Sequence, residues 1–213
     1  FFDECKINYA ENCLTREDND DSIIFHSENK NKRNYSWGEL RSAVFKFASY
    51  LKNNNIQKND RIAAILPNIP ETVISFLSTA QLGAIWSSCS SDFGKKAIID
   101  RFKQIEPKVL LFSDYYFYNN KKVDTTKVIK DVIYNIPSIE KVILIPYEFN
   151  ETDYHLDFEY DNFYNILQQE IEYNKFEKFN FNHPLYILYS SGTTGIPKCI
   201  VHSSGGALIQ HKK

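Results

Sequence analysis

The chain has 213 residues, of which 43% are hydrophobic and 15% aromatic, and it carries 25 basic and 27 acidic residues. This composition excludes a largely disordered chain and predicts one large domain with a buried core. Charge is nearly balanced, and the one short basic cluster, Lys30, Lys32 and Arg33, is expected in a solvated turn, so nucleic acid and anionic membranes are poor partners.

The first helix is predicted over residues 37–53. Ser36 and Glu39 have the spacing of a capping box, in which each side chain binds the other residue's backbone N–H. Apolar residues then recur at helical spacing from Leu40 to Leu51. The apolar face of this helix requires a sheet to cover it.

Strands and helices alternate along the chain as far as residue 145. The predicted strands are 61–66, 84–88, 108–112 and 141–145, and the predicted helices are 71–82, 95–105 and 125–134. Such alternation is typical of βαβ units, so the expected fold class is α/β, a mostly parallel sheet with helices on both faces. Residues 147–182 show weak periodicity around 163–171, and we interpret them as an insertion that elaborates the surface.

The segment 189–198 reads Tyr-Ser-Ser-Gly-Thr-Thr-Gly-Ile-Pro-Lys and lies between two predicted strands. Its glycines can adopt positive φ and turn backbone N–H groups toward one point, its hydroxyls add donors, and Pro197 stiffens the exit. Polyphosphate is the ligand that this combination favours. The candidate phosphate ligands are Ser191, Gly192, Thr193, Thr194, Gly195 and Lys198.

Two other interpretations of this loop are weaker. The common NTPase loop places glycine and lysine side by side before a helix, whereas here Lys198 follows Gly195 by three positions and a strand comes next. A hairpin loop without a ligand is frequent among segments rich in serine, threonine and glycine. It accounts poorly for two glycines, a proline and a lysine at these fixed places.

The string 189–198 resembles, over its whole length, the signature loop of the acyl-adenylate-forming superfamily, which includes acyl-CoA synthetases, firefly luciferase and peptide-synthetase adenylation domains. Residues 35–40, 61–70, 184–188 and 200–206 are also similar to this family. The resemblance implies that residues 1–213 are part of the large AMP-binding domain at the N-terminal end of an acyl-CoA synthetase. A first residue other than Met and the lack of any Met favour a fragment without the small C-terminal domain.

The resemblance also implies a reaction. Family members use ATP and Mg²⁺ to convert a carboxylic acid to an acyl-adenylate, and coenzyme A then displaces AMP. Residues 191–195 would hold the β- and γ-phosphates, and Lys198 would stabilise the loop or the departing pyrophosphate. Because the family's adenylation lysine lies in the small domain, we expect no catalytic residue in this chain and no complete reaction by it alone.

Residues 83–94 read Gly-Ala-Ile-Trp-Ser-Ser-Cys-Ser-Ser-Asp-Phe-Gly and are similar to the acetoacetate-specific branch, which usually has proline at the position of Ser91. This similarity implies acetoacetate as the acid. Two alternatives stay open. One is a ligase for another short acid, such as acetate, propionate or butyrate, and the other is a non-catalytic nucleotide-binding remnant.

Related acetyl-CoA synthetases contact the CoA nucleotide through an Arg-Gly-Gly-Lys patch. The matching segment here, 118–121, reads Tyr-Asn-Asn-Lys, so Lys121 is either a CoA contact or a solvated lysine. We interpret Trp86 and Cys89 as wall and core of the sheet, and His202 as a structural histidine in preference to an acyl-site residue.

The four cysteines, Cys5, Cys13, Cys89 and Cys199, have neither Cys-x-x-Cys pairs nor matching histidines, which excludes a recognisable zinc site and favours free thiols. The first residues lack a signal-peptide pattern, and the longest apolar runs are too short to cross a bilayer. We therefore expect a cytoplasmic protein. The sequence leaves its oligomeric state open.

Overall fold

The computed structural model describes residue 2 and residues 4–148, 155–190 and 195–213. Within these ranges a seven-stranded sheet has the order β10-β9-β6-β4-β5-β12-β13. Its strands are β4 (Arg61–Ile65), β5 (Ile85–Cys89), β6 (Val109–Ser113), β9 (Lys141–Ile145), β10 (Asp161–Asn162), β12 (Pro184–Ser190) and β13 (Lys198–Ser203). Neighbours pair in parallel except β12 and β13, which form an antiparallel hairpin.

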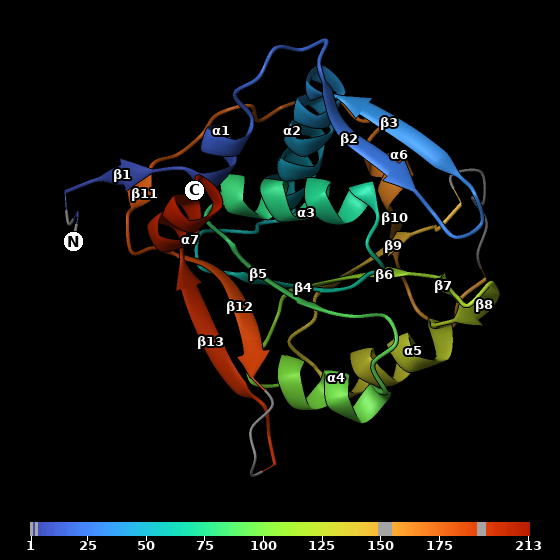
Figure 1. Ribbon diagram of the computed structural model, residues 1–213. Helices are drawn as coiled ribbons and strands as arrows, with labels where there is room; N and C mark the ends of the chain where they lie inside the picture. The colour runs from blue at the N-terminus through green and yellow to red at the C-terminus, as the bar shows by residue number, and fades with distance from the viewer. Residues whose placement is uncertain (1, 3, 149–154, 191–194) are drawn as a thin grey trace.

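Helices cover both faces of the sheet, as the sequence predicts (Figure 1). On one face lie α2 (Trp37–Asn53) and α3 (Pro70–Gln81), and on the other lie α4 (Lys95–Phe102) and α5 (Thr126–Asn135). The central strand β4 serves both cores, because successive side chains of a strand point to opposite faces. Ile62 and Ala64 belong to the cluster under α2 and α3, whereas Ala63 and Ile65 belong to the cluster with α4 and α5. The α/β fold class with a mostly parallel sheet is confirmed.

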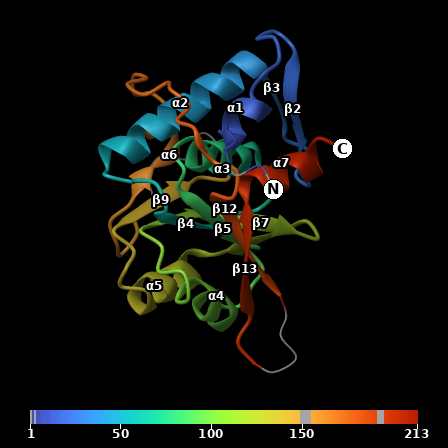
Figure 2. The same cartoon turned by 90° about the vertical axis from the view of Figure 1, so that its left-hand side faces the viewer.

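Smaller elements surround this frame (Figure 2). They comprise the antiparallel pairs β2 with β3, β7 with β8, and β1 with β11, together with three short helices. Their bounds are β1 (Lys6–Ile7), α1 (Tyr9–Cys13), β2 (Asp21–His26), β3 (Lys32–Ser36), β7 (Tyr115–Tyr118), β8 (Lys121–Asp124), α6 (Phe163–Ile166), β11 (Phe179–Asn180) and α7 (Ser204–His211). No helix among the described residues is long and apolar enough to cross a bilayer.

Helix α2 begins with the predicted capping box. The Glu39 carboxylate accepts from the Ser36 N–H at 2.7 Å, and the Ser36 hydroxyl accepts from the Glu39 N–H at 3.2 Å. After α3, Gly83 has φ +68°, and a Cβ at this position would lie 2.4 Å from the Phe179 ring. Glycine is therefore required here both by the backbone angle and by the space available.

Two predictions about these elements need correction. Helix α4 ends at Phe102, not at residue 105, because the chain turns before Pro107 and Glu106 adopts φ +46°. Residues 147–182 do not simply elaborate the surface. β10 extends the sheet, and the described part of this segment places Phe163, Tyr173 and Phe179 in buried positions.

Candidate functional site

The predicted phosphate loop joins β12 to β13 at the carboxyl end of β12. β12 pairs in parallel with β5, so the loop begins at the edge where ligands bind in open α/β sheets. Ser190 pairs with Lys198 and closes the hairpin beneath the loop. Ser191, Gly192, Thr193 and Thr194 lie outside the described residues. Their assignment as phosphate ligands stays a prediction.

The exit of the loop, from Gly195 to Lys198, is described by the structure. Gly195 adopts φ +111°, and no atom lies within 4 Å of a Cβ added there. The backbone angle, not crowding, therefore accounts for glycine at this position. Lys198 is exposed at the start of β13, whereas Pro197 is buried. A shallow depression of about 580 Å³ adjoins this exit, and its lining includes Gly195, Pro197, the basic side chains Lys95, Lys96 and Arg101, and the acidic side chain Asp100. Lys95 and Lys96 form ion pairs with Asp131 and Asp100.

The entrance of the loop is anchored in the sheet through Tyr189. Its hydroxyl accepts a hydrogen bond from the Ser87 hydroxyl at 3.0 Å and donates to the Arg101 carbonyl at 3.5 Å. Burial raises the pKa of Tyr189, so the hydroxyl keeps its proton. The Arg101 guanidinium lies 5.7 Å from the Tyr189 ring centre and 4.8 Å from that of Phe93. These contacts fix the position of Tyr189, from which the chain continues through Ser190 into the loop.

Two residues of the predicted surroundings lie as the sequence suggests, and the role of His202 stays a prediction. Trp86 and Cys89 are buried in the sheet, and burial raises the pKa of the Cys89 thiol to about 12, which disfavours the nucleophilic thiolate. His202 is half-buried on β13, with its ring 4.9 Å from the ring of Tyr186. All four cysteines are free thiols.

Lys121 is not brought together with the phosphate loop. It is exposed at the start of β8, and Figure 1 shows the β7–β8 hairpin at the opposite side of the sheet from the β12–β13 hairpin. The turn before Lys121 contains Asn119 at φ +50° and Asn120 at φ +60°. Asparagine tolerates this left-handed region, so the turn does not depend on glycine. Lys121 as a CoA contact stays a prediction.

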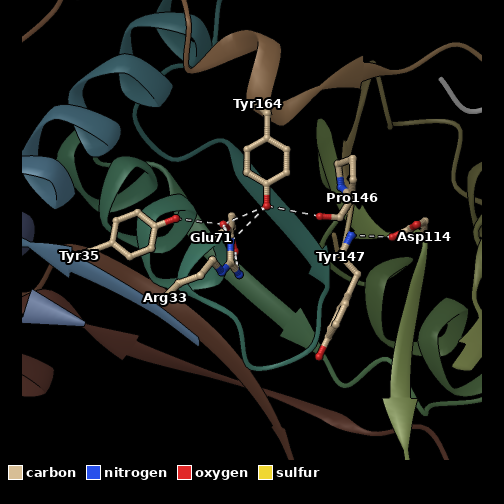
Figure 3. Close-up of polar contacts among 7 residues, drawn as sticks. All are labelled: Arg33, Tyr35, Glu71, Asp114, Pro146, Tyr147 and Tyr164. Atoms are coloured by element: carbon tan, nitrogen blue, oxygen red, sulfur yellow. Dashed lines mark hydrogen bonds and ion pairs between the residues drawn. The ribbon is translucent and has the colours of Figure 1, made fainter. Parts of the chain in front are cut away.

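A buried polar cluster around Glu71 was missed by the sequence analysis (Figure 3). The Glu71 side chain is 0% exposed and is held by the Arg33 guanidinium at 2.5 and 3.0 Å. Tyr164 donates to the same carboxylate at 3.0 Å, and Tyr35 donates at 3.3 Å. Burial and the carboxylate raise the pKa of Tyr164, which keeps it a donor. Arg33 does not lie in a solvated turn, in contrast to the exposed Lys30.

This cluster connects the β2–β3 hairpin to helix α3 at the carboxyl end of the sheet. Glu71 stands in the first turn of α3, directly after β4, and Arg33 belongs to β3. Beside them, the Asp114 carboxylate after β6 accepts from the Tyr147 N–H after β9 at 2.8 Å (Figure 3). The sequence carried no signal for the cluster, because Arg33 stands between Lys32 and Asn34, residues that favour a solvated turn, and nothing identified its partner.

Comparison with known proteins defines the family. The family described as AMP-binding enzyme matches residues 11–213. The chain belongs to the AMP-binding enzymes. Among relatives of this AMP-binding chain, an acetoacetyl-coenzyme A synthetase of Rhizobium meliloti is 42% identical over 100% of the chain and 33% of its own length. An acetoacetyl-CoA synthetase of Xenopus tropicalis is 39% identical over 99% of the chain and 33% of its own length.

A solved structure agrees with this placement. Acetoacetyl-CoA synthetase from Streptomyces lividans superimposes with a TM-score of 0.90 at 35% identity, covering 97% of this chain and 32% of that protein. The AMP-binding chain therefore spans about one third of the length of the relatives that it matches. The alignment with the Rhizobium meliloti relative covers the whole chain and therefore includes β12, β13 and the loop between them.

Proposed function

We propose that this chain forms the phosphate-holding part of an ATP-dependent acid–CoA ligase. The observation that carries the proposal is the segment 189–198, which joins two strands at the carboxyl end of a parallel sheet in an AMP-binding enzyme. The positive φ of Gly195 and the exposed position of Lys198 support it. A polyphosphate bound here would meet backbone N–H groups, hydroxyls and a cation.

Each part of the loop has a proposed task. Ser191, Gly192, Thr193, Thr194 and Gly195 would hold the β- and γ-phosphates of ATP, with Mg²⁺ sharing their charge. Lys198 would neutralise charge that develops on the departing pyrophosphate, which is how proteins contribute to phosphorus-centred transfers. Lys121 would contact the nucleotide of coenzyme A from the β7–β8 turn.

We propose acetoacetate as the acid. The names of the relatives from Rhizobium meliloti, Xenopus tropicalis and Streptomyces lividans support this choice, together with the similarity of residues 83–94 to the acetoacetate branch. In the proposed reaction the acetoacetate carboxylate displaces pyrophosphate from ATP, and the CoA thiol then displaces AMP from the acyl-adenylate.

We further propose that the chain is the N-terminal third of a longer ligase, because it spans about one third of each relative. The lysine that the family uses for adenylation would then lie outside these 213 residues. The chain alone would not complete acyl-CoA synthesis. ATP–pyrophosphate exchange by the purified 213-residue chain with acetoacetate would contradict this part of the proposal.

The central test measures ATP–pyrophosphate exchange by the full-length protein with a panel of short acids. We expect acetoacetate to give the highest kcat/KM, ahead of acetate, propionate and butyrate. Lys198→Ala should slow exchange by about 100- to 1,000-fold, the range for removal of one donor that stabilises transition-state charge. Lys127→Ala on the exposed face of α5 serves as the matched control. Exchange with none of the acids would refute the ligase, and an unchanged rate in Lys198→Ala would remove Lys198 from the site.

A further inference from the structure

The turn that follows helix α4 contacts the exit of the phosphate loop through the side chain of Gln104. Its Nε2 donates to the Pro197 carbonyl at 2.9 Å and to the Asp100 carbonyl at 2.7 Å. Its Oε1 accepts from the Cys199 thiol at 3.6 Å. Two carbonyls at one end of the amide and a thiol at the other define which end is nitrogen. Both ends of this exposed side chain are therefore engaged, across more than 90 residues of sequence.

These contacts flank Lys198 on both sides along the chain. The Pro197 carbonyl belongs to the same planar peptide unit as the Lys198 N–H, so a hydrogen bond to that oxygen fixes the orientation of the peptide plane that precedes the Lys198 Cα. Cys199 follows Lys198 and touches the same glutamine. The proline ring restricts φ at position 197, and the pairing of Lys198 with Ser190 constrains the Lys198 backbone from the neighbouring strand. Only one external side chain, Gln104, completes this arrangement among the described residues.

Helix α4 also contacts the other end of the loop. Arg101, three residues before Gln104, receives a hydrogen bond on its carbonyl from Tyr189 at 3.5 Å and places its guanidinium over the Tyr189 ring. The last turn of α4 and the turn that follows it thus contact both ends of the loop, at Tyr189 and at Pro197. Lys103 lies between these two residues in sequence, is exposed, and makes no side-chain hydrogen bond or ion pair with the described part of the hairpin. It offers a matched control for substitutions of Gln104.

We propose that Gln104 is a positioning residue that orients Lys198 for its task at the polyphosphate. Gln104 acts through the Pro197–Lys198 peptide and does not itself contact substrate. This inference rests on the proposed function, because it assigns to Lys198 the charge-stabilising role described above.

The test uses four variants of the full-length protein: Gln104→Glu, Gln104→Ala, Lys103→Ala, and Gln104→Ala combined with Lys198→Ala. Gln104→Glu keeps the size and the acceptor oxygen but replaces the donor by a carboxylate that faces two carbonyls. We expect both Gln104 substitutions to lower the kcat of ATP–pyrophosphate exchange by about fivefold to tenfold, as expected for the loss of one or two hydrogen bonds. KM for the acid should stay within about twofold, and Lys103→Ala should match the wild type in both constants.

The double variant separates positioning from a general structural role. If Gln104 acts through Lys198, Gln104→Ala should change exchange by less than about twofold when Lys198 is already alanine. An equal loss in both backgrounds, or a loss in Lys103→Ala as large as in Gln104→Ala, would overturn the inference.

A second measurement does not depend on catalysis. Amide hydrogen exchange over residues 195–199 should be faster in Gln104→Ala than in the wild type or Lys103→Ala, with the melting temperature unchanged within about 2 °C. Unchanged exchange there would overturn the inference even if the enzyme is active. An inactive wild type with faster exchange in Gln104→Ala would refute the ligase proposal and leave the contact of Gln104 with the loop exit established.

Discussion

Removal of Arg33 should destabilise this protein far more than removal of a surface ion pair. The Glu71 side chain is 0% exposed and that of Arg33 is 23% exposed, so Arg33→Ala leaves a carboxylate buried without its cation. Breaking a buried ion pair on one side costs about 3 to 5 kcal/mol. Because Tyr35 and Tyr164 still donate to the carboxylate, we expect the lower end, a loss of about 3 kcal/mol in the free energy of unfolding.

Urea unfolding followed by circular dichroism measures this loss, and for a domain of this size it corresponds to a fall in Tm of about 6 to 12 °C. Lys130→Ala is the matched control, because it breaks an ion pair with Asp157 in which both side chains are more than half exposed. That variant should lose no more than about 0.5 kcal/mol. Addition of Glu71→Gln to Arg33→Ala removes the uncompensated charge and should recover at least about 1 kcal/mol.

A loss below about 1 kcal/mol in Arg33→Ala, similar to that of an exposed pair, would show that Glu71 does not depend on Arg33. Failure of the Glu71→Gln addition to recover stability would show that the lost contact, not the stranded charge, accounts for the effect.

Three further outcomes are expected. Gly83→Ala should lower the free energy of unfolding by about 2 to 4 kcal/mol in urea titrations, because a Cβ would meet the Phe179 ring at a positive φ; a loss below about 0.5 kcal/mol would contradict the geometry. Burial lowers the pKa of His183 below its usual 6.5, so the folded state binds fewer protons than the unfolded state below that pH. The contribution of His183 to the free energy of unfolding should therefore be complete above pH 6.5 and should fall as the pH drops below it, and the fall should be smaller in His183→Gln. Parallel pH profiles of the two proteins would show that His183 does not cause the pH dependence. Burial raises the pKa of Cys89 to about 12, so a thiol reagent at pH 8 should modify the exposed Cys5 at least about 100 times faster than Cys89. Peptide mass spectrometry measures both rates, and equal rates would mean that Cys89 is accessible.

Local sequence signals predicted the parts of the fold whose causes are local. The capping box of Ser36 and Glu39 and the apolar stripe after it specified α2 to the residue, and Gly83 marked the end of α3. Apolar runs located β4, β6 and β9, since a strand buried on both faces is apolar throughout. The segment 189–198 stood out because it combines particular residue types at fixed spacing, and its binding of phosphate stays a prediction.

Contacts between distant segments were beyond these signals. Arg33 and Glu71 are 38 residues apart, and Tyr164 reaches Glu71 across 93 residues. Neither partner belongs to a motif, and a glutamate in the first turn of a helix is usually explained by the helix dipole alone. The sequence did not identify Gln104 either, because its contacts also lie with a distant segment. Its role depends on where α4 ends relative to the β12–β13 hairpin, and the sequence placed that end three residues too late.

The order of strands in the sheet differs from their order in the chain, and this bears on folding kinetics. β4, β5, β6, β9 and β10 pair among themselves and are all synthesised by residue 162. β12 then returns to lie beside β5, with Ser87 binding the carbonyl of a residue 100 positions later. Closing such a long loop is slow compared with forming a hairpin, whereas β12 and β13 can pair locally as soon as both exist. Docking of the preformed β12–β13 hairpin onto β5 is therefore expected as a late step, and a nascent chain acquires its phosphate loop only after the rest of the sheet is in place.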